Sequence, residues 1–361
     1  MARKGKSSSR RNKIEPSAMT IGLVITAPPG VTSSHYCDVS QIACLVNRRF
    51  YRQGLNWGVA GFKAFNVDGI AGGISISKLP NTWVMANAWE KSMRAWMKMN
   101  RDALEESESI RPRFLDFKIY ADSLHHQQGY GANLLPYGAI APATAGEWES
   151  SKVSIPLTTP AGVIDVGQTI EREFVATGAS YPGVSVATGF DAVSLIEGYA
   201  SSRGLPDVLD PNVPGDALDA GGSTPENWMG AMFNEGTNQT HDVLEDLTTE
   251  NNQAPYPFEG GNDPNEFLPS GLPNPGWNLP FPDTMYPGGA NQLTGLQYHD
   301  AEYFTPTTIS NIVRLKGGNF PCGLIRFDTT NSGLESATFS VVIDLIPGRH
   351  RGYLAESMVE M

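Results

Sequence analysis

Asn56–Phe65 reads NWGVAGFKAF and Gly73–Lys78 reads GISISK, and in both stretches apolar residues alternate with small or polar ones. Alternation with a period of two puts every second side chain on the same face of a β-strand. Asp68-Gly69 lies between the two stretches, and Asp-Gly is a strong turn signal. The pattern therefore predicts two paired strands joined by a turn.

Strand-like stretches continue on both sides of this pair. We predict further strands at Met19–Thr26, Phe114–Ala121, Glu147–Ile155, Thr169–Ala176, Val193–Tyr199, Thr308–Lys316, Cys322–Phe327 and Ala337–Ile346. The chain has 361 residues, with 38 Gly, 26 Pro and only 18% charged residues, which favours many strands and loops over long helices. We therefore predict a mainly β fold: an antiparallel two-sheet jelly roll with helices in the connections and a long loop-rich insertion.

Two helices are predicted within these connections. The first covers Asp38–Gln53, with Asp38 or Ser40 as its cap and Gly54 as its stop. The second begins at Asn81 or Thr82 and ends near residues 105–109. Its apolar stripe at helical spacing predicts packing against a sheet: Met85, Trp89, Met93, Trp96, Asn100 and Leu104.

Charge and composition divide the chain into four regions. Residues 1–18 are predicted to be a basic flexible arm, 19–203 the first part of the jelly-roll domain, and 296–361 its last strands and C-terminal tail. Residues 204–295, rich in Asp, Asn, Pro and Gly, are predicted to be an outward, loop-rich insertion. The net charge is −12, yet residues 1–14 contain six basic residues and no acid, so the remaining chain carries −18.

The basic arm is the strongest candidate site. Its cationic side chains are Arg3, Lys4, Lys6, Arg10, Arg11 and Lys13. Lys and Arg neutralise phosphates and release counterions without reading base sequence. The arm therefore predicts contact with nucleic acid, and a nuclear-localisation signal or a plain disordered tail are the alternatives.

Metal and catalytic motifs are weak. Asp207, Asp210, Asp216 and Asp219 crowd a glycine-containing stretch that could hold Ca²⁺, although the spacing does not match an EF-hand and a solvated loop is favoured. His125-His126 follows Asp122, and we predict an exposed loop pair there because adjacent residues at a strand end point to opposite faces. No phosphate-binding loop or dinucleotide fingerprint is present. We predict no enzyme activity and no cofactor.

Cysteine content and hydropathy bear on the compartment. Three cysteines are too few for a disulfide framework, which favours a reducing environment. No stretch approaches the roughly 18 apolar residues of a membrane span, so no membrane partner is predicted.

Four short motifs carry a family resemblance: Asn47-Arg-Arg-Phe-Tyr-Arg-Gln-Gly54, Leu79-Pro-Asn-Thr-Trp-Val84, Asn87-Ala-Trp-Glu-Lys91 and Asp116-Phe-Lys-Ile119. Together they resemble the capsid proteins of small circular single-stranded DNA viruses, with the bacilladnavirus-like group the nearest. The resemblance covers mainly residues 37–125. The arm is short for this family: six charges on each of at least sixty subunits give on the order of 360, well below the phosphates of a genome of several kilobases.

The resemblance implies a single jelly roll that assembles with itself into an icosahedral shell and packages a single-stranded genome. It implies a virion location, assembly in the host nucleus or cytoplasm, and a host-cell receptor that contacts the exterior insertion. Arg48, Arg49 and Arg52 then form a candidate inner-surface patch. From the residues alone these arginines could face the genome, bridge to a neighbouring subunit or lie solvated.

Two other functions compete with a capsid role. A carbohydrate-binding or adhesive β-sandwich, such as a fibre head or lectin-like module, explains the β content and the tryptophans but leaves the basic arm unexplained. A β-sandwich hydrolase would use paired carboxylates such as Glu147 and Glu149, which alternate with Trp148 on a predicted strand. That spacing is common by chance, so this is the weakest alternative.

Overall fold

The computed structural model describes residues 17–105, 114–138, 141–158, 164–178, 185–196, 199, 295–305 and 307–361. The arm residues 1–16 and residues 200–294 lie outside this set. The candidate calcium ligands Asp207, Asp210, Asp216 and Asp219 and most of the predicted outward insertion therefore lie outside the described residues.

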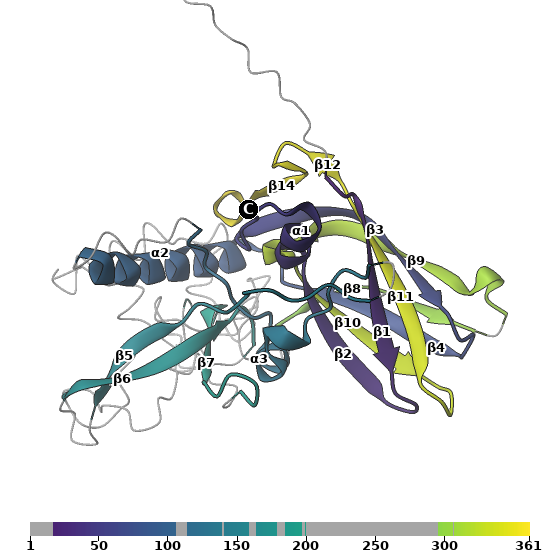
Figure 1. Cartoon of the computed structure of the whole chain (residues 1–361), viewed down its shortest axis with the longest axis horizontal. Coiled ribbons are helices and arrows are strands. Elements are labelled where there is room, and N and C mark those ends of the chain that lie inside the picture. Colours follow the sequence, from purple (N-terminus) through teal and green to yellow (C-terminus); the bar gives the residue numbers. More distant parts are fainter. Residues whose placement is uncertain are drawn as a thin grey trace, which may run out of the picture.

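Two antiparallel sheets form the larger half of the molecule (Figure 1). The first contains β1 (Thr20–Ala27), β11 (Ala337–Leu345), β3 (Leu55–Asn66) and β14 (Ala355–Ser357), and β9 (Ile312–Phe320) also pairs with β3. The second has the order β2 (Thr32–Asp38), β10 (Leu324–Asn331), β4 (Gly72–Lys78) and β8 (Gln297–Phe304). The prediction of a mainly β, antiparallel fold is confirmed.

Alternation along the strands builds the core between these sheets. In β11 every second residue, from Ala337 to Leu345, is buried, and β1 buries Ile21, Leu23 and Ile25 in the same way. Aromatic side chains fill the space between the two inner faces: Trp57, Phe62, Phe320, Phe327 and Phe339. Burial of this apolar surface is the main stabilising contribution to the domain.

The predicted pairing of the two opening stretches is wrong. They form β3 and β4, but β3 pairs with β11 and β9 whereas β4 pairs with β10 and β8. The Asp68-Gly69 turn is present, with Gly69 at φ 69°, and it carries the chain from one sheet to the other. Alternation shows that a strand has one buried face and does not identify the neighbouring strand.

The strand expectations from the rest of the chain are mostly met within a few residues. Three predictions fail in whole or in large part. Phe114–Ala121 runs as irregular backbone with a single bridge between Tyr120 and Val175. The predicted strand Glu147–Ile155 is a loop up to residue 152, and the predicted strand Val193–Tyr199 turns helical at Leu195. Besides the short strands after residue 346, two strands escaped prediction, β2 and β8, which read TSSHYCD and QYHDAEYF. Both are too polar to show an apolar alternation.

Helix α1 (Val39–Asn47) connects the two sheets between β2 and β3. Asp38 caps it by accepting hydrogen bonds from the backbone N–H groups of Ser40 and Gln41. It ends well before the predicted Gln53, because Arg48 adopts a left-handed conformation at φ 56° and its N–H donates to Cys44. The helix therefore stops without glycine.

The connection between β4 and β8 holds a second, smaller assembly beside the sheets (Figure 1). It contains α2 (Trp83–Glu105), α3 (Ser123–Gln128) and a three-stranded sheet of β5 (Val153–Thr158), β6 (Ile164–Val175) and β7 (Ala192–Ser194). Thr82 caps α2 through a hydrogen bond from Met85 N–H, as predicted. The short hairpin of β12 (Pro347–Gly348) and β13 (Gly352–Tyr353) precedes β14.

A second apolar core joins this assembly to the outer face of the second sheet. Tyr36 of β2 and Leu324 of β10 contribute from the sheet, while Trp89 and Trp96 of α2 and Phe174 of β6 contribute from the connection. Strand β2 serves both cores, because Cys37 points between the sheets and Tyr36 points outward. The predicted packing of the α2 stripe on a sheet is confirmed.

Candidate nucleic-acid interface

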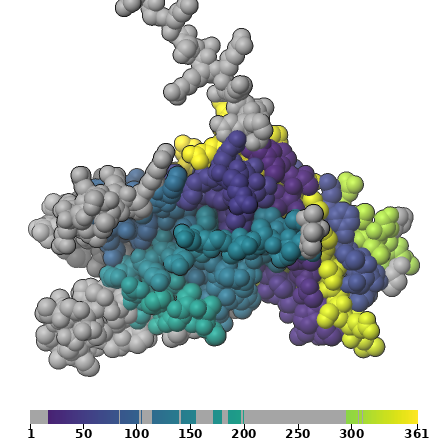
Figure 2. All heavy atoms as spheres, viewed as in Figure 1, coloured from purple at the N-terminus to yellow at the C-terminus, as the bar shows by residue number. Residues whose placement is uncertain are grey.

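The N-terminal segment leaves the domain beside the end of α1. Ala18 N–H donates to Asn47 Oδ1 at 3.0 Å, and the Tyr353 hydroxyl donates to the Ala18 carbonyl at 2.7 Å. Ser17 Oγ donates to the Arg351 carbonyl at 2.9 Å. The six basic arm residues lie outside the described chain. The root of the arm, Ser17 and Ala18, is held between α1 and the β12–β13 hairpin. In Figure 2 the purple N-terminal elements and yellow C-terminal residues adjoin at this place.

Five arginines come together around this root. Three are the predicted Arg48, Arg49 and Arg52, which directly follow α1. The other two, Arg349 and Arg351, are in the turn of the β12–β13 hairpin, and all except the half-buried Arg49 are exposed. We call Arg48, Arg49, Arg52, Arg349 and Arg351 the arm-root arginines.

Contacts between the two sequence segments show that they are neighbours. The Arg351 guanidinium donates to the Phe50 carbonyl, and the Tyr51 hydroxyl donates to the Arg351 carbonyl at 3.1 Å. The pKa of His350 is lowered, first by burial and then by the charges of Arg351 and Arg52. Sequence reasoning missed the second segment, although Arg-His-Arg at 349–351 was a visible basic run, because 300 residues separate it from the first.

A buried hydrogen-bond network keeps Arg52 and its surroundings in place. The Gln53 side chain donates to Asp38 Oδ2 at 2.9 Å and to the Ile119 carbonyl at 3.1 Å, and accepts from Ile119 N–H at 2.7 Å. Trp148 Nε1 also donates to Asp38 Oδ2, at 3.1 Å. Because Asp38 caps α1 as well, one carboxylate joins α1, the segment after it and the chain around residue 119.

The histidine prediction is wrong: His125 and His126 are fully buried, and they lie on α3, not in an exposed loop. Ala121 N–H donates to His125 Nδ1 at 3.0 Å, which leaves Nε2 to donate to Asn133 Oδ1 at 2.8 Å. Burial lowers the pKa of His125 to about 4, so this ring is neutral. A local helix begun by its Asp122 cap places both rings on the interior side.

His126 has a different partner from its neighbour. Its Nε2 lies 2.8 Å from Glu173 Oε2, and Glu173 also accepts hydrogen bonds from Ser150 and Thr188. Burial raises the pKa of Glu173, but these hydrogen bonds outweigh it and the net pKa is lowered. The pair therefore links α3 to β6 and is a structural contact.

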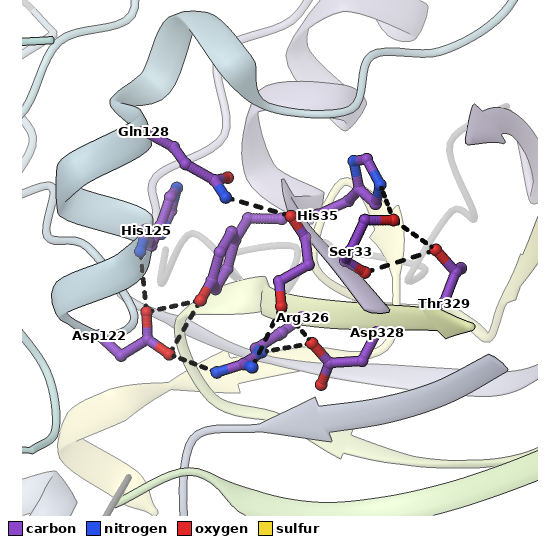
Figure 3. Close-up of polar contacts among 10 residues, drawn as sticks. Ser33, His35, Asp122, His125, Gln128, Arg326, Asp328 and Thr329 are labelled. Atoms are coloured by element: carbon purple, nitrogen blue, oxygen red, sulfur yellow. Dashed lines mark hydrogen bonds and ion pairs between the residues drawn. The ribbon is translucent and has the colours of Figure 1, made fainter. Parts of the chain in front are cut away.

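Asp122 links the smaller assembly to the second sheet (Figure 3). It accepts from the Tyr36 hydroxyl at 2.7 and 2.9 Å, from His125 N–H at 2.8 Å and from Arg326 Nη1 at 3.1 Å. Arg326 also donates to Asp328 at 2.8 Å and to Ser34 Oγ at 3.1 Å. Every charged group here has a partner, as burial requires, and the junction fixes how the two parts sit.

The other candidate chemical sites are not assembled in the described part of the chain. Glu147 and Glu149 are exposed on a loop that precedes β5, and so do not share a strand face as predicted. Among the residues that the structure describes, no three His, Cys, Asp or Glu side chains gather as a metal ion would require. In the same part of the chain, no helix is long and apolar enough to cross a membrane.

Comparison of the chain with models of protein families, with curated proteins and with solved structures gave no match. The strand order and the arm-root arginines are therefore the features that bear on function.

Proposed function

We propose that this chain is the capsid protein of a small single-stranded DNA virus, whose two sheets form a jelly roll. The carrying observation is the order of the eight main strands. Numbered along the chain, β1 to β4 are strands one to four and β8 to β11 are strands five to eight. The sheets then have the orders one-eight-three-six and two-seven-four-five. Successive Greek keys place the first strand beside the last in this way, and jelly rolls of capsids and lectins share it.

The position of the extra chain fits a shell wall. Everything between β4 and β8, residues 79–296, is inserted in a single connection between strands four and five. The described part of this insertion packs on the outer face of the second sheet and leaves the inner core intact. A capsid subunit can therefore carry a large excursion without disturbing the domain that forms the wall.

The turns at one end of the sheets favour self-association. Gly30 N–H donates to the Asn331 carbonyl and Ser332 N–H to the Ala71 carbonyl, both at 2.9 Å, so three turns lie together there. Each exposes an aliphatic side chain: Val31 at 52%, Val67 at 66% and Leu334 at 98%. Exposed apolar groups that lie close together are typical of contact surfaces, and other copies of the chain are the proposed partners.

The arm-root arginines favour nucleic acid over carbohydrate as the second partner. Carbohydrate is neutral and gains little from five arginines on two neighbouring segments, whereas each guanidinium can neutralise a phosphate. Because the basic arm starts at the same place, arm and surface together can follow one polyanion. The arm-root arginines also add positive charge to the six charges of the arm, which by themselves neutralise only a small share of the phosphates of a genome.

Assembly is the direct test of the capsid proposal. We expect purified protein to form closed shells or discrete oligomers, observed by negative-stain microscopy and sedimentation across pH, salt and divalent-ion conditions. A protein that stays monomeric in all of these conditions contradicts the proposal. Specific glycan binding by such a monomer would favour the adhesive alternative.

Packaging is tested by deletion of residues 2–14. The domain is expected to keep its melting temperature, because residues 2–14 are almost entirely polar and offer little apolar surface to bury, while co-purifying nucleic acid falls sharply. The ratio of absorbance at 260 and 280 nm measures this loss. A matched control keeps the length of the arm but replaces its six Lys and Arg residues by Gln, and should behave like the deletion. An unchanged ratio in both variants would mean that the arm-root arginines, and not the arm, bind the nucleic acid.

A further inference from the structure

A cavity of about 640 Å³ opens next to the arm-root arginines. It lies between α2, the segment after α1, the segment around residue 116 and the C-terminal residues after β13. Its walls are aromatic and thioether side chains from α2 and its neighbours: Phe50, Trp89, Met93, Trp96, Met97 and Phe117. Its polar lining consists of Arg52, Asp116, His350, Arg351 and Ser357. The volume is that of a typical small-ligand site.

The aromatic walls are close enough to act as one surface. The rings of Trp96 and Phe117 are 5.5 Å apart, and those of Trp89 and Phe117 are 6.2 Å apart. Trp96 is anchored by a hydrogen bond from Nε1 to the Lys152 carbonyl at 3.1 Å. A Cβ at position 54 would overlap the indole of Trp89, so Gly54 is needed for the indole to lie where it does. The ring planes in these two pairs are inclined by 43° and 60°, so the rings form an angled aromatic wall against which a planar ring can pack.

The charged groups lie on the side of the cavity next to the arm root. Arg52 Nε donates to the Leu115 carbonyl at 3.2 Å, with its guanidinium 5.7 Å from the centre of the Phe50 ring. Arg351 is held by the Phe50 carbonyl. Both remain exposed overall, so each can offer further N–H donors to an anion.

Asp116 is the single acid of the lining. It accepts a hydrogen bond from Gln53 N–H at 3.2 Å. Burial raises its pKa to about 7, against the weaker opposing effects of the Gln53 hydrogen bond, Lys118 and Arg52. Near neutral pH a large share of this carboxyl is therefore uncharged. It can donate to or accept from a polar ring edge, and repels an anion less than a full carboxylate does.

We propose that this cavity binds one nucleotide of a single-stranded nucleic acid. The base lies against Trp89, Trp96 and Phe117, and the phosphate lies at Arg52 and Arg351. The inference rests on the proposed packaging function and adds a defined contact point to it. The location supports it, since two of the arm-root arginines, Arg52 and Arg351, line the cavity. A purely aliphatic ligand would leave the two guanidinium groups unused.

The test uses the full chain and short single-stranded oligodeoxynucleotides, with quenching of tryptophan fluorescence as readout. A fully abasic oligonucleotide of the same length is the decisive comparison. We expect intact oligonucleotides to quench and a fully abasic one to bind without quenching. Equal quenching by both would overturn the proposal, because it would show that only phosphates are bound.

Variants locate the contact. Arg52→Gln and Arg351→Gln should each weaken binding about tenfold, the effect of losing one charge-assisted hydrogen bond. The matched control is Arg94→Gln, on the same helix as Trp89 and Trp96 but exposed and paired with Glu90. It should bind like the parent protein. Equal losses in control and cavity variants, at unchanged melting temperatures, would assign the binding to general surface charge.

This outcome is separable from failure of the packaging proposal. Shells that form and carry nucleic acid, but whose subunits show no base-dependent quenching, reject the cavity site and leave the capsid function standing. A chain that neither assembles nor retains nucleic acid rejects the function itself. Base-dependent quenching in a protein that never assembles would instead indicate a nucleotide-binding protein without a shell.

Discussion

Asp116 is a single residue whose ionisation opposes folding. Its pKa is about 7 in the folded chain against 3.8 for an ordinary aspartate, so the folded state holds the proton more tightly. The loss of folding stability caused by its ionisation is absent below pH 4 and grows as the pH rises. It reaches its full value above about pH 7. Lys118, Arg52 and Asp38 are the charges that act on it.

We predict that Asp116→Asn stabilises the protein at pH 8 by on the order of 2–4 kcal/mol, and by less at pH 5. Urea unfolding at both pH values measures the difference. Asp344→Asn is a control of opposite sign, because the hydrogen bond from Lys63 lowers the pKa of Asp344. The Asp344→Asn variant should be less stable than the parent protein at pH 8, and the two should be equally stable in acid. A pH-independent gain for Asp116→Asn would show that burial does not control this carboxyl.

Arg48 combines an unfavourable backbone conformation with a charge at the arm root. Its φ of 56° is in the left-handed region, which costs an ordinary L-residue about 1 kcal/mol and glycine almost nothing. We predict that Arg48→Gly raises the free energy of unfolding by about 1 kcal/mol and yet lowers nucleic-acid affinity. Thermal melts and salt-dependent binding measure the two effects. The control Arg48→Lys should keep both the nucleic-acid affinity and the backbone strain. Normal affinity in Arg48→Gly would show that Arg48 does not contact nucleic acid.

At the scale of the element, α2 shows how well a long periodic stretch can be predicted. Trp96 is only 8% exposed, and the helix begins at the predicted cap. We predict that Trp96→Ala costs about 3–5 kcal/mol, the usual effect of removing a buried large ring. Chemical denaturation measures it, with Arg94→Ala on the exposed side expected within about 0.5 kcal/mol of the parent. A Trp96→Ala protein that melts with the parent would mean that the ring is an intersubunit contact.

Helix α3 shows the limit of prediction for short elements. Six residues reading SLHHQQ carry too few positions for a periodic signal. Asp122, which caps the helix by accepting from His125 N–H, is the one local indication of a helix in this stretch. Tertiary packing decided the outcome, since Tyr36 stacks on His125 at 4.4 Å and Glu173 reaches His126. Neither partner is near in sequence.

At the scale of the whole molecule, residues 204–295 of the insertion between β4 and β8 are the part proposed to face outward. Apart from Gly295, these residues lie outside the described chain, and their Pro and Gly content disfavours long regular elements. We predict that limited proteolysis of assembled particles cuts mainly within this segment while residues 1–18 stay protected inside. Mass spectrometry of the fragments locates the cuts. Free subunits are the control, because the arm and residues 204–295 should both be cut in them. Rapid loss of the arm from particles whose insertion stays intact would reverse the orientation.

The sequence by itself determined the local features of this protein. Alternation identified most strands, the apolar stripe and Thr82 identified α2, and the charge distribution separated a basic arm from an acidic body. These signals depend on neighbours a few residues apart, and so they can be read from the chain.

Only the tertiary structure decided which strands pair and which charges meet. The turn at Asp68-Gly69 suggested a hairpin, but strands from the last fifty residues insert beside β3 and β4 because burial of both faces of the core is favoured over local pairing. In the same way Arg52 meets Arg351, and the cavity forms from four separate segments. Such contacts join residues 300 or more positions apart, and no local pattern of residues encodes them.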